Sequence, residues 1–260
     1  MKVCLTIAGL DPSGGAGIIA DIKTFGAFGC FATAAVSSLT FQNTVAVSGA
    51  EHQSAATLRG QVAPILEDYE VSAVKTGMLP TREIIDETAR LIGEGNLRNY
   101  VVDPVVRSTS GFDLIDHVAL RALIEKLFPL SDLITPNIPE AERISGLRID
   151  TRESVKEAAR RMHAMGAKNV LIKGGHMVGD DAGKAIDFLF VGERLTMFEA
   201  ERLETTATHG TGCTLSAAIT ANLALGKSLV DAVEAAKMFV LEAIRTAPKL
   251  GHGHSPINIR

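Results

Sequence analysis

The sequence predicts an α/β fold: a single domain, residues 1–260, built on a mostly parallel sheet with helices on both faces. Short apolar runs typical of buried strands alternate with amphipathic helical patterns along the whole chain. The length suits one large α/β domain, and 46% hydrophobic residues can build a substantial core. No internal repeat, low-complexity segment or linker divides the sequence.

The composition argues against some classes of binding partner. A net charge of −4 and the absence of tryptophan leave no broad basic or base-stacking surface, so we do not expect nucleic acid as a partner. No apolar run approaches the roughly 20 residues of a membrane span, and residues 1–10 are too short for a signal peptide. Three cysteines without metal-ligand spacing are typical of a reducing compartment. We therefore expect a cytoplasmic protein with no membrane partner.

Residues 3–8 are predicted to form the first strand, and residues 18–28 a helix. The loop between them is rich in glycine, but its spacing matches neither the dinucleotide fingerprint nor the P-loop. Asp11 and Ser13 place polar groups at the carboxyl end of the strand, where α/β proteins hold ligands. The loop is therefore interpreted as a substrate loop; the alternative is a tight structural connection.

The next elements bring one candidate binding residue. An apolar segment at residues 31–40 leads to Gln42, whose amide offers a donor and an acceptor suited to the edge of a nitrogen heterocycle. A short strand is predicted to begin at residues 45–47 and a helix to cover residues 54–66. A further strand ends at residues 73–78, and Thr81 is predicted to cap the helix that runs to residue 92.

Two more strands end in acidic or amide residues. Asp103 follows a strand at residues 100–102, a position where parallel sheets hold ligands and metal ions, and a polar loop follows at residues 107–111. Asn137 and Glu140 follow the strand at residues 133–134, three positions apart. Oxygen ligands of this kind suit Mg²⁺ in a nucleotide site. The alternative is an ordinary helix cap.

The following third of the chain is expected to be mainly scaffold. Residues 151–165 form a charged helix, and residues 170–173 a strand that ends in the turn Lys173–Gly–Gly–His176. Lys173 is placed to meet a phosphate, or it is an ordinary surface lysine. A hairpin is expected at residues 185–198, a final helix at residues 228–246, and a loop rather than a metal site at residues 251–255.

The stretch at residues 206–218 joins a polar, glycine-containing turn to a long apolar helix. Gly210 and Gly212 allow backbone N–H groups to approach an anion at the positive end of the helix dipole. Cys213 lies on the first helical turn, where we expect its thiol pKa to fall below its free value of about 8.5. The stretch therefore predicts an anion site; the alternative is a loop entering a core helix with a buried cysteine.

Seven blocks and the tail together resemble one family. The blocks are IAGLDPSGGAG, LTFQNT, KTGM, DPVV, TPNIPEAE, LIKGGH and HGTGCTLSAA, followed by the tail GHGHSP. In this order they are similar to the hydroxymethylpyrimidine/phosphomethylpyrimidine kinases of the ribokinase-like superfamily. The resemblance implies a three-layer αβα sandwich and two phosphoryl transfers from ATP, with Mg²⁺, to a hydroxymethylpyrimidine in thiamine biosynthesis. It also suggests a homodimer.

The resemblance also implies roles for individual residues. Substrate, nucleotide, metal and anion-hole positions are each matched by a block of this sequence. By the resemblance, the substrate positions are Asp11 in the substrate loop, Ala16, Gln42 and Met78 around the pyrimidine, and Val105 and Val106, which close that pocket. The positions that act on Mg²⁺ and phosphate are Asn137 and Glu140, and those on the nucleotide side are Lys173, Thr206 and Thr208. The anion hole is formed by Gly210, Thr211, Gly212 and Cys213. Cys213 stands where many relatives have an aspartate base, and it acts either as a base or only through its position.

Three departures from the family pattern bear on substrate choice. Phe41 replaces a small residue and is expected to narrow the pocket, Val106 replaces a frequent methionine, and Arg107 either favours a monophosphate substrate or points to solvent. The first alternative function is therefore a pyridoxal or pyridoxine kinase of the same superfamily. The second is a non-catalytic protein that senses the pyrimidine.

Overall fold

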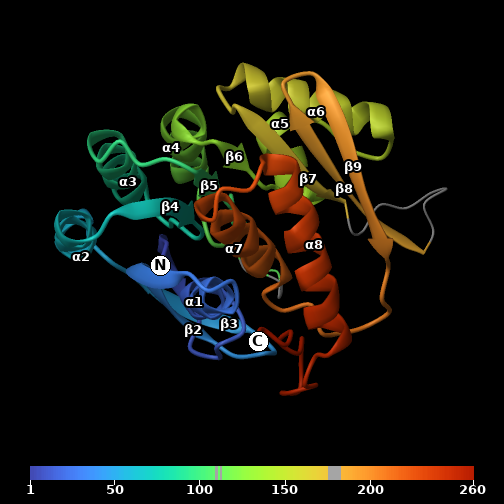
Figure 1. Ribbon diagram of the computed structural model, residues 1–260, viewed down its shortest axis with the longest axis horizontal. Coiled ribbons are helices and arrows are strands. Elements are labelled where there is room, and N and C mark those ends of the chain that lie inside the picture. The colour runs from blue at the N-terminus through green and yellow to red at the C-terminus, as the bar shows by residue number, and fades with distance from the viewer. Residues whose placement is uncertain (109–110, 112, 175–182) are drawn as a thin grey trace.

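The computed structural model describes residues 1–108, 111, 113–174 and 183–260. These residues form a nine-stranded sheet in the order β3-β2-β1-β4-β5-β6-β7-β8-β9 (Figure 1). The strands are β1 (Val3–Leu10), β2 (Phe31–Gln42), β3 (Val47–His52), β4 (Val71–Thr76), β5 (Tyr100–Val102), β6 (Leu133–Ile134), β7 (Asn169–Gly174), β8 (Lys184–Val191) and β9 (Arg194–Glu201).

The centre of the sheet is parallel and its edges are antiparallel. Strands β2, β1, β4, β5, β6 and β7 run in one direction, whereas β3 pairs antiparallel with β2 at one edge and β8 and β9 form a hairpin at the other. The prediction of a mostly parallel sheet is confirmed. Six consecutive parallel strands bring their carboxyl ends to one edge, where α/β proteins hold their ligands.

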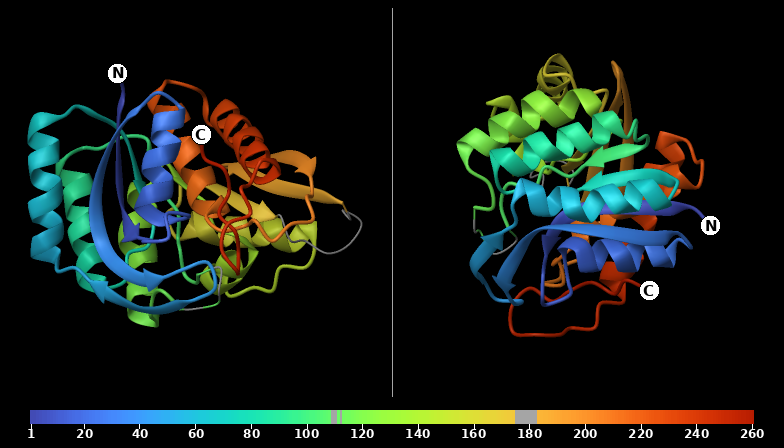
Figure 2. Two further views of the ribbon diagram at one scale, coloured as in Figure 1. Left: turned by 90° about the horizontal axis from the view of Figure 1, so that it is seen from below. Right: turned by 90° about the vertical axis from the view of Figure 1, so that its left-hand side faces the viewer.

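Helices cover both faces of the sheet, as predicted for a three-layer sandwich (Figure 2). The first, seventh and eighth helices pack together on one face, and the others cover the opposite face. The first group is α1 (Gly17–Ala27), α7 (Thr211–Ala224) and α8 (Leu229–Arg245); the second is α2 (Ala55–Asp68), α3 (Arg82–Glu94), α4 (His117–Leu127), α5 (Ile138–Ser145) and α6 (Arg152–Ala164).

The central strands are apolar on both sides because both faces of the sheet are covered. One core under α2–α6 includes Leu5, Ile7 and Tyr100, and two smaller cores under α1, α7 and α8 contain Phe25 and Leu215. Helix α7 has almost no polar face because it packs between α1, α8 and the sheet. It is therefore a rigid base for whatever its first turn binds.

Local sequence explains where most helices begin. Ser54, Thr81, Asp116 and Ser228 each accept a backbone N–H from the first turn of the helix that follows. The predicted Thr81 cap is confirmed. Each cap satisfies a donor that has no intrahelical partner, and this fixes the position at which the chain enters the helix.

The structure differs from the prediction at the turn before β3. This strand begins at Val47 and not at Val45. The carbonyl oxygen of the Asn43 side chain accepts the N–H groups of Val45 and Ala46 at 2.9 and 3.0 Å, so these residues form a turn.

The hairpin predicted at residues 185–198 is confirmed. All three cysteines are free, and the buried pair Cys4 and Cys30 packs as small hydrophobic residues. In the part of the chain that the structure describes, no helix combines the length and the apolarity needed to cross a membrane.

Candidate active site

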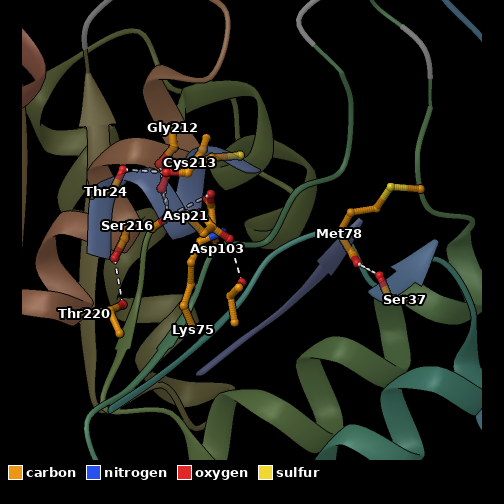
Figure 3. Close-up of polar contacts among 12 residues, drawn as sticks. Asp21, Thr24, Ser37, Lys75, Met78, Asp103, Gly212, Cys213, Ser216 and Thr220 are labelled. Carbon is orange, nitrogen blue, oxygen red and sulfur yellow. Dashed lines mark hydrogen bonds and ion pairs between the residues drawn. The ribbon is translucent and has the colours of Figure 1, made fainter. Parts of the chain in front are cut away.

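The carboxyl ends of β1, β4, β5 and β7 lie around the start of α7. In Figure 3, Asp21, Lys75 and Asp103 converge beneath Gly212 and Cys213. These residues come from a helix, a strand and a loop that are far apart in the sequence. The fold therefore brings these residues together from distant parts of the chain, and no local sequence motif contains all three.

Gly210 precedes α7 in a left-handed conformation, with φ of 84°. A Cβ atom at this position would lie 1.8 Å from the carbonyl oxygen of Gly15, so the substrate loop packs directly on the turn. Only glycine combines this φ value with so close an approach. The predicted approach of this backbone to an anion stays a prediction, and the neighbour that the structure shows at Gly210 is another loop of the protein.

The N–H groups of this turn are not equally available. Thr211 donates its N–H to the carbonyl of Thr208 at 3.3 Å, and Thr214 donates to Gly210 at 2.9 Å. The N–H groups of Gly212 and Cys213 lie in the first turn, which provides no intrahelical acceptor. Among the described residues, the N–H groups of Gly212 and Cys213 therefore have no hydrogen-bond acceptor and are available to an anion.

Lys173 adds a full positive charge beside these N–H groups. A Cβ atom at Gly212 would lie 3.3 Å from Nζ of Lys173, so the ammonium lies against the helix start. Asp103 holds this ammonium at 2.9 Å, and Lys173 is only 13% exposed. The alternative of an ordinary surface lysine is wrong. The helix dipole and the ammonium together suit a phosphate or another anion.

Asp103 is buried and ionised. Burial alone would raise its pKa, but the charges of Lys173 and Lys75 and hydrogen bonds from Lys173 and Ser216 lower it. The Ser216 hydroxyl donates to one carboxylate oxygen at 3.1 Å, and Lys173 binds the other. Asp103 therefore ties the loop after β5 to both β7 and α7.

The thiol of Cys213 differs from the prediction. Burial, together with the negative charges of Asp103 and Asp21, raises the pKa of Cys213 to about 11. Lys75 and a backbone hydrogen bond from Gly17 lower it, but not enough to offset burial. The expected reactive thiolate is wrong for the ligand-free protein, because the helix dipole is a smaller effect than the loss of water around the sulfur.

Asn137 and Glu140 form a reciprocal capping box at the start of α5. The side-chain oxygen of Asn137 accepts the N–H of Glu140 at 2.9 Å, and Oε2 of Glu140 accepts the N–H of Asn137 at 2.8 Å. The amide oxygen of Asn137 is therefore already used. It positions Glu140, which also approaches the N–H of Val106 at 3.5 Å.

The carboxyl group of Glu140 is poised to titrate near neutral pH. Burial raises the pKa of Glu140 to about 7, and Asp103 adds to this effect, while Lys173 and the hydrogen bonds from Asn137 and Val106 oppose it. A buried carboxylate that is costly to ionise gains most from a cation nearby. Mg²⁺ commonly uses one or two carboxylates together with substrate phosphates. The pair Glu140 and Asp103 fits that requirement.

A buried ion pair beneath the helix start was not predicted from the sequence. Nζ of Lys75 binds Oδ2 of Asp21 at 2.8 Å, and both side chains are 0% exposed. The hydroxyl of Thr6 donates to the same carboxylate oxygen at 2.6 Å. Burial would lower the pKa of Lys75, but the negative charges of Asp21 and Asp103 and the hydrogen bond to Asp21 raise it, so this lysine stays positive. Its sequence signal is weak, because a lysine in a strand normally faces water.

The substrate loop is organised by Asp11. Its buried carboxylate accepts the N–H groups of Ser13 and Ala16 at 2.8 and 2.9 Å, and it lies 2.8 Å from Nε2 of His209. Burial would raise the pKa of Asp11, but the hydrogen bonds from His209 and Ser13 lower it below its usual value. His209 was missed as an individual site residue, although it directly precedes Gly210.

Gln42 lies at the end of β2 and approaches the same group. Its Nε2 atom lies 3.4 Å from Nε2 of His209. The structure thus brings together Asp11, Ala16, Gln42 and His209, which are spread over the first and last thirds of the sequence.

The apolar candidates lie at the ends of neighbouring strands. Met78 is buried, with its sulfur 3.0 Å from the position of a Cβ at Gly9, and its carbonyl accepts the hydroxyl of Ser37 at 2.6 Å. Val106 is buried, while Val105 remains partly exposed. Gly9 thus gives Met78 room against the first strand.

The remaining candidates are more exposed. Thr206 lies in water, and Thr208 is half-buried, with its hydroxyl 3.3 Å from Nδ1 of His254. Phe41 is 54% exposed and lies against Gly49 of β3, and Arg107 is exposed and pairs with Asp113 at 3.0 Å. Residues 109 and 110 of the predicted polar loop, and residues 175 and 176 of the predicted turn, lie outside the described residues.

Comparisons with known proteins agree over nearly the whole chain. A family model described as phosphomethylpyrimidine kinase matches residues 11–258. The hydroxymethylpyrimidine/phosphomethylpyrimidine kinase of Bacillus subtilis (strain 168) is 43% identical over 254 residues, covering 98% of this chain and 93% of that protein. The thiamine biosynthesis bifunctional protein ThiED of Geobacter sulfurreducens is 46% identical over 98% of this chain, which spans only 51% of that protein.

Among solved structures, a similar one is the ADP complex of Bacillus subtilis pyridoxal kinase. It has a TM-score of 0.89 and 39% sequence identity, and the match covers 99% of this chain and 97% of that one. The fold is therefore shared by proteins named for two different substrates.

Proposed function

The chain belongs to the phosphomethylpyrimidine kinase family, and we therefore propose that it phosphorylates 4-amino-5-hydroxymethyl-2-methylpyrimidine. The product of the first transfer is the monophosphate, and a second transfer gives the diphosphate for thiamine biosynthesis. ATP is the phosphoryl donor. The observation that carries the proposal is the start of α7, where two free N–H groups lie beside the ammonium of Lys173.

Transfer of a phosphoryl group needs alignment and charge stabilisation more than covalent help. The N–H groups of Gly212 and Cys213 and the charge of Lys173 are fixed before substrate arrives, because α7 and the Asp103 ion pair hold them. Groups fixed in this way stabilise developing negative charge without reorganising. These residues supply the anion hole.

Mg²⁺ and ATP fit the acidic side of the same site. Glu140, with Asp103 behind it, would hold the metal ion, and Asn137 fixes the position of Glu140 through the capping box. Bound Mg²⁺ neutralises charge on the phosphate oxygens. Lys173, Thr206 and Thr208 lie on the nucleotide side, and ionisation of Glu140 accompanies binding of the metal.

Asp11, Ala16, Gln42, Met78, Val105 and Val106 form the substrate side in this proposal. Gln42 reads the polar edge of the pyrimidine ring, and Met78 with the two valines contacts its apolar surface. Phe41 does not narrow this pocket, because its ring lies exposed against Gly49. Arg107 is already paired with Asp113.

Cys213 contributes mainly through its backbone in the ligand-free protein. With a pKa of about 11, only about one thiol in ten thousand is ionised at pH 7. A role as the base requires bound ligands to change this balance. The Cys213→Ala variant separates the roles: retained kcat supports the backbone role, and a loss of about a hundredfold or more supports a base.

The competing substrate is pyridoxal, since a pyridoxal kinase shares the fold at 39% identity. The test is mass analysis of products after incubation with Mg-ATP and either the hydroxymethylpyrimidine or pyridoxal. We expect pyrimidine monophosphate followed by diphosphate. Monophosphate alone would limit the activity to the first step, and phosphorylated pyridoxal with unchanged pyrimidine would overturn the substrate.

Two further properties belong to this proposal. We expect a homodimer, supported by the edge strand β3 and the exposed apolar side chains of Leu39, Phe41 and Val45 near it. Sedimentation equilibrium tests this expectation. We also expect a cytoplasmic protein, consistent with three free cysteines.

A further inference from the structure

The strongest unused feature is the buried pair of Asp11 and His209. The two side chains are 3% and 7% exposed and lie 198 residues apart in sequence, with Oδ2 and Nε2 at 2.8 Å. The imidazole ring is also wedged in place, since a Cβ atom at Gly15 would lie 2.3 Å from its Cδ2 atom. The ring therefore has one orientation.

The contact fixes one hydrogen on the ring. Asp11 is an acceptor only, because its carboxylate is ionised and already receives N–H groups from Ser13 and Ala16. Nε2 of His209 must therefore carry a hydrogen and donate it to Asp11. This holds whether the ring is neutral or protonated.

This hydrogen decides the orientation of the Gln42 amide. With Nε2 of Gln42 placed 3.4 Å from Nε2 of His209, two donors face each other. At the other end, the single hydrogen of the Thr40 hydroxyl has two acceptors within reach, the carbonyl of Leu10 at 2.9 Å and Oε1 of Gln42 at 3.1 Å, and it can satisfy only one of them fully. A half-turn of the amide resolves both conflicts, because it places the oxygen beside His209 and the NH₂ group beside Thr40.

We propose that His209, held by Asp11, is a specificity-determining residue that fixes the order of donor and acceptor on Gln42. The amide oxygen then faces the site on the His209 side, and the amide NH₂ group faces it on the Thr40 side. This order matches a ring edge with an amino group next to an unprotonated ring nitrogen, which is the edge of a 4-aminopyrimidine. The inference rests on the proposed function.

The fixed order also aims the reacting group. In the proposed substrate the hydroxymethyl group lies next to the amino group, on the side away from the ring nitrogen. When the amino group bonds the amide oxygen near His209, the hydroxymethyl group extends beyond His209. The next residues in the chain are Gly210 to Cys213, the anion hole. The reverse order of donor and acceptor on Gln42 would turn the substrate hydroxyl towards Thr40 and away from the phosphoryl group to be transferred.

The test compares two substrates that differ only at this edge. One is 4-amino-5-hydroxymethyl-2-methylpyrimidine, and the other is its 4-oxo analogue, which presents an N–H and a carbonyl in the reverse order. The wild-type kcat/KM should favour the amino compound by about a thousandfold or more, because a mismatched edge leaves buried polar groups unpaired. The ratio is measured by mass analysis of the phosphorylated products.

Two variants each remove one of the two contacts that fix the orientation of the Gln42 amide. In His209→Asn the shorter side chain withdraws the N–H that faces Asp11 and Gln42, and in Thr40→Val the acceptor for the NH₂ group is lost. Each should lower the preference ratio by about tenfold or more, raise KM for the pyrimidine and leave KM for ATP unchanged. His117→Asn, a histidine change at the exposed start of α4, is the matched control and should keep the wild-type ratio.

The outcomes separate the two proposals. Thermal melting establishes which variants are folded, and either folded variant decides the matter. An unchanged ratio in a folded, active variant overturns the role of His209 while the kinase assignment stands. A wild-type protein that phosphorylates no pyrimidine overturns the proposed function, and the role of His209 falls with it.

Discussion

At the scale of single residues, charge alternates beneath the start of α7. Lys75 pairs with Asp21, and Lys173 pairs with Asp103. Figure 3 shows Asp21, Lys75 and Asp103 close together beneath the first turn of α7. Lys173 keeps part of its surface open, at 13% exposed, whereas Lys75 has none. The ammonium of Lys173 is therefore available to a ligand, whereas the buried ammonium of Lys75 stabilises the site from within the protein.

Replacing Lys75 by methionine should destabilise the protein by about 3–5 kcal/mol, because it leaves the Asp21 carboxylate buried without a counter-charge. The double variant Lys75→Met/Asp21→Leu should recover most of this loss, since it removes both charges. Urea unfolding of the two variants and the wild type measures the difference. A single variant as stable as the wild type would show that the ion pair contributes little.

Glu140 should make stability depend on pH. Its pKa is about 7 in the folded protein, against 4.5 for a free glutamate side chain. The folded state therefore holds the proton more tightly, and stability falls as pH rises from about 4.5 to about 7. Relative to Glu140→Gln, the wild type should lose up to about 3 kcal/mol across this window. Unfolding free energies at several pH values, without Mg²⁺, measure the loss.

The control for this prediction is Glu193→Gln, in the exposed turn between β8 and β9. Its curve should run parallel to that of the wild type, because the side chain stays in water. If the wild type and Glu140→Gln also ran parallel from pH 4.5 to 7, the buried carboxyl would not be the cause.

At the scale of elements, the start of α7 matters most. Gly210 contacts the substrate loop, Gly212 borders Lys173, and the helix behind them is packed on nearly every side. The two glycines act in different ways: Gly210 sets the path of the backbone, and Gly212 leaves room for the ammonium of Lys173.

Alanine at Gly210 should destabilise the protein far more than alanine at Gly226. Both glycines have positive φ, 84° and 86°, so both variants bear a similar backbone strain of roughly 1–2 kcal/mol. Only at Gly210 would the new Cβ atom collide with another backbone, at 1.8 Å, whereas Gly226 has open space. Thermal melting of the two variants measures the difference, and equal losses would contradict the packing argument.

At the scale of the whole molecule, the sequence predicted the sheet well because its strands are buried on both faces and read as apolar runs. It also placed Asp103, Glu140 and Lys173 at the edge where they meet. It did not predict that Lys75 is buried, or that Thr211 spends its N–H on Thr208, because both depend on distant contacts. The Cys213 prediction failed for a related reason: local sequence reports the helix dipole but not the burial.

The prediction of a single domain concerns how the whole molecule unfolds. The sheet is continuous from β3 to β9, so heating should unfold residues 1–260 in one cooperative transition. Differential scanning calorimetry should give equal calorimetric and van't Hoff enthalpies. Two separated transitions would instead indicate that the β8–β9 hairpin and its surroundings melt independently.

The tail at residues 251–258 contacts segments that are distant in the sequence, beside the proposed substrate site. The N–H of His254 bonds the carbonyl of Thr44 at 2.8 Å, and the carbonyl of Ser255 accepts the N–H of His209 at 3.3 Å. During translation, these segments leave the ribosome more than two hundred residues after Thr44. A nascent chain can build its sheet early, but its reaction centre is completed last. Incomplete chains should therefore consume no ATP.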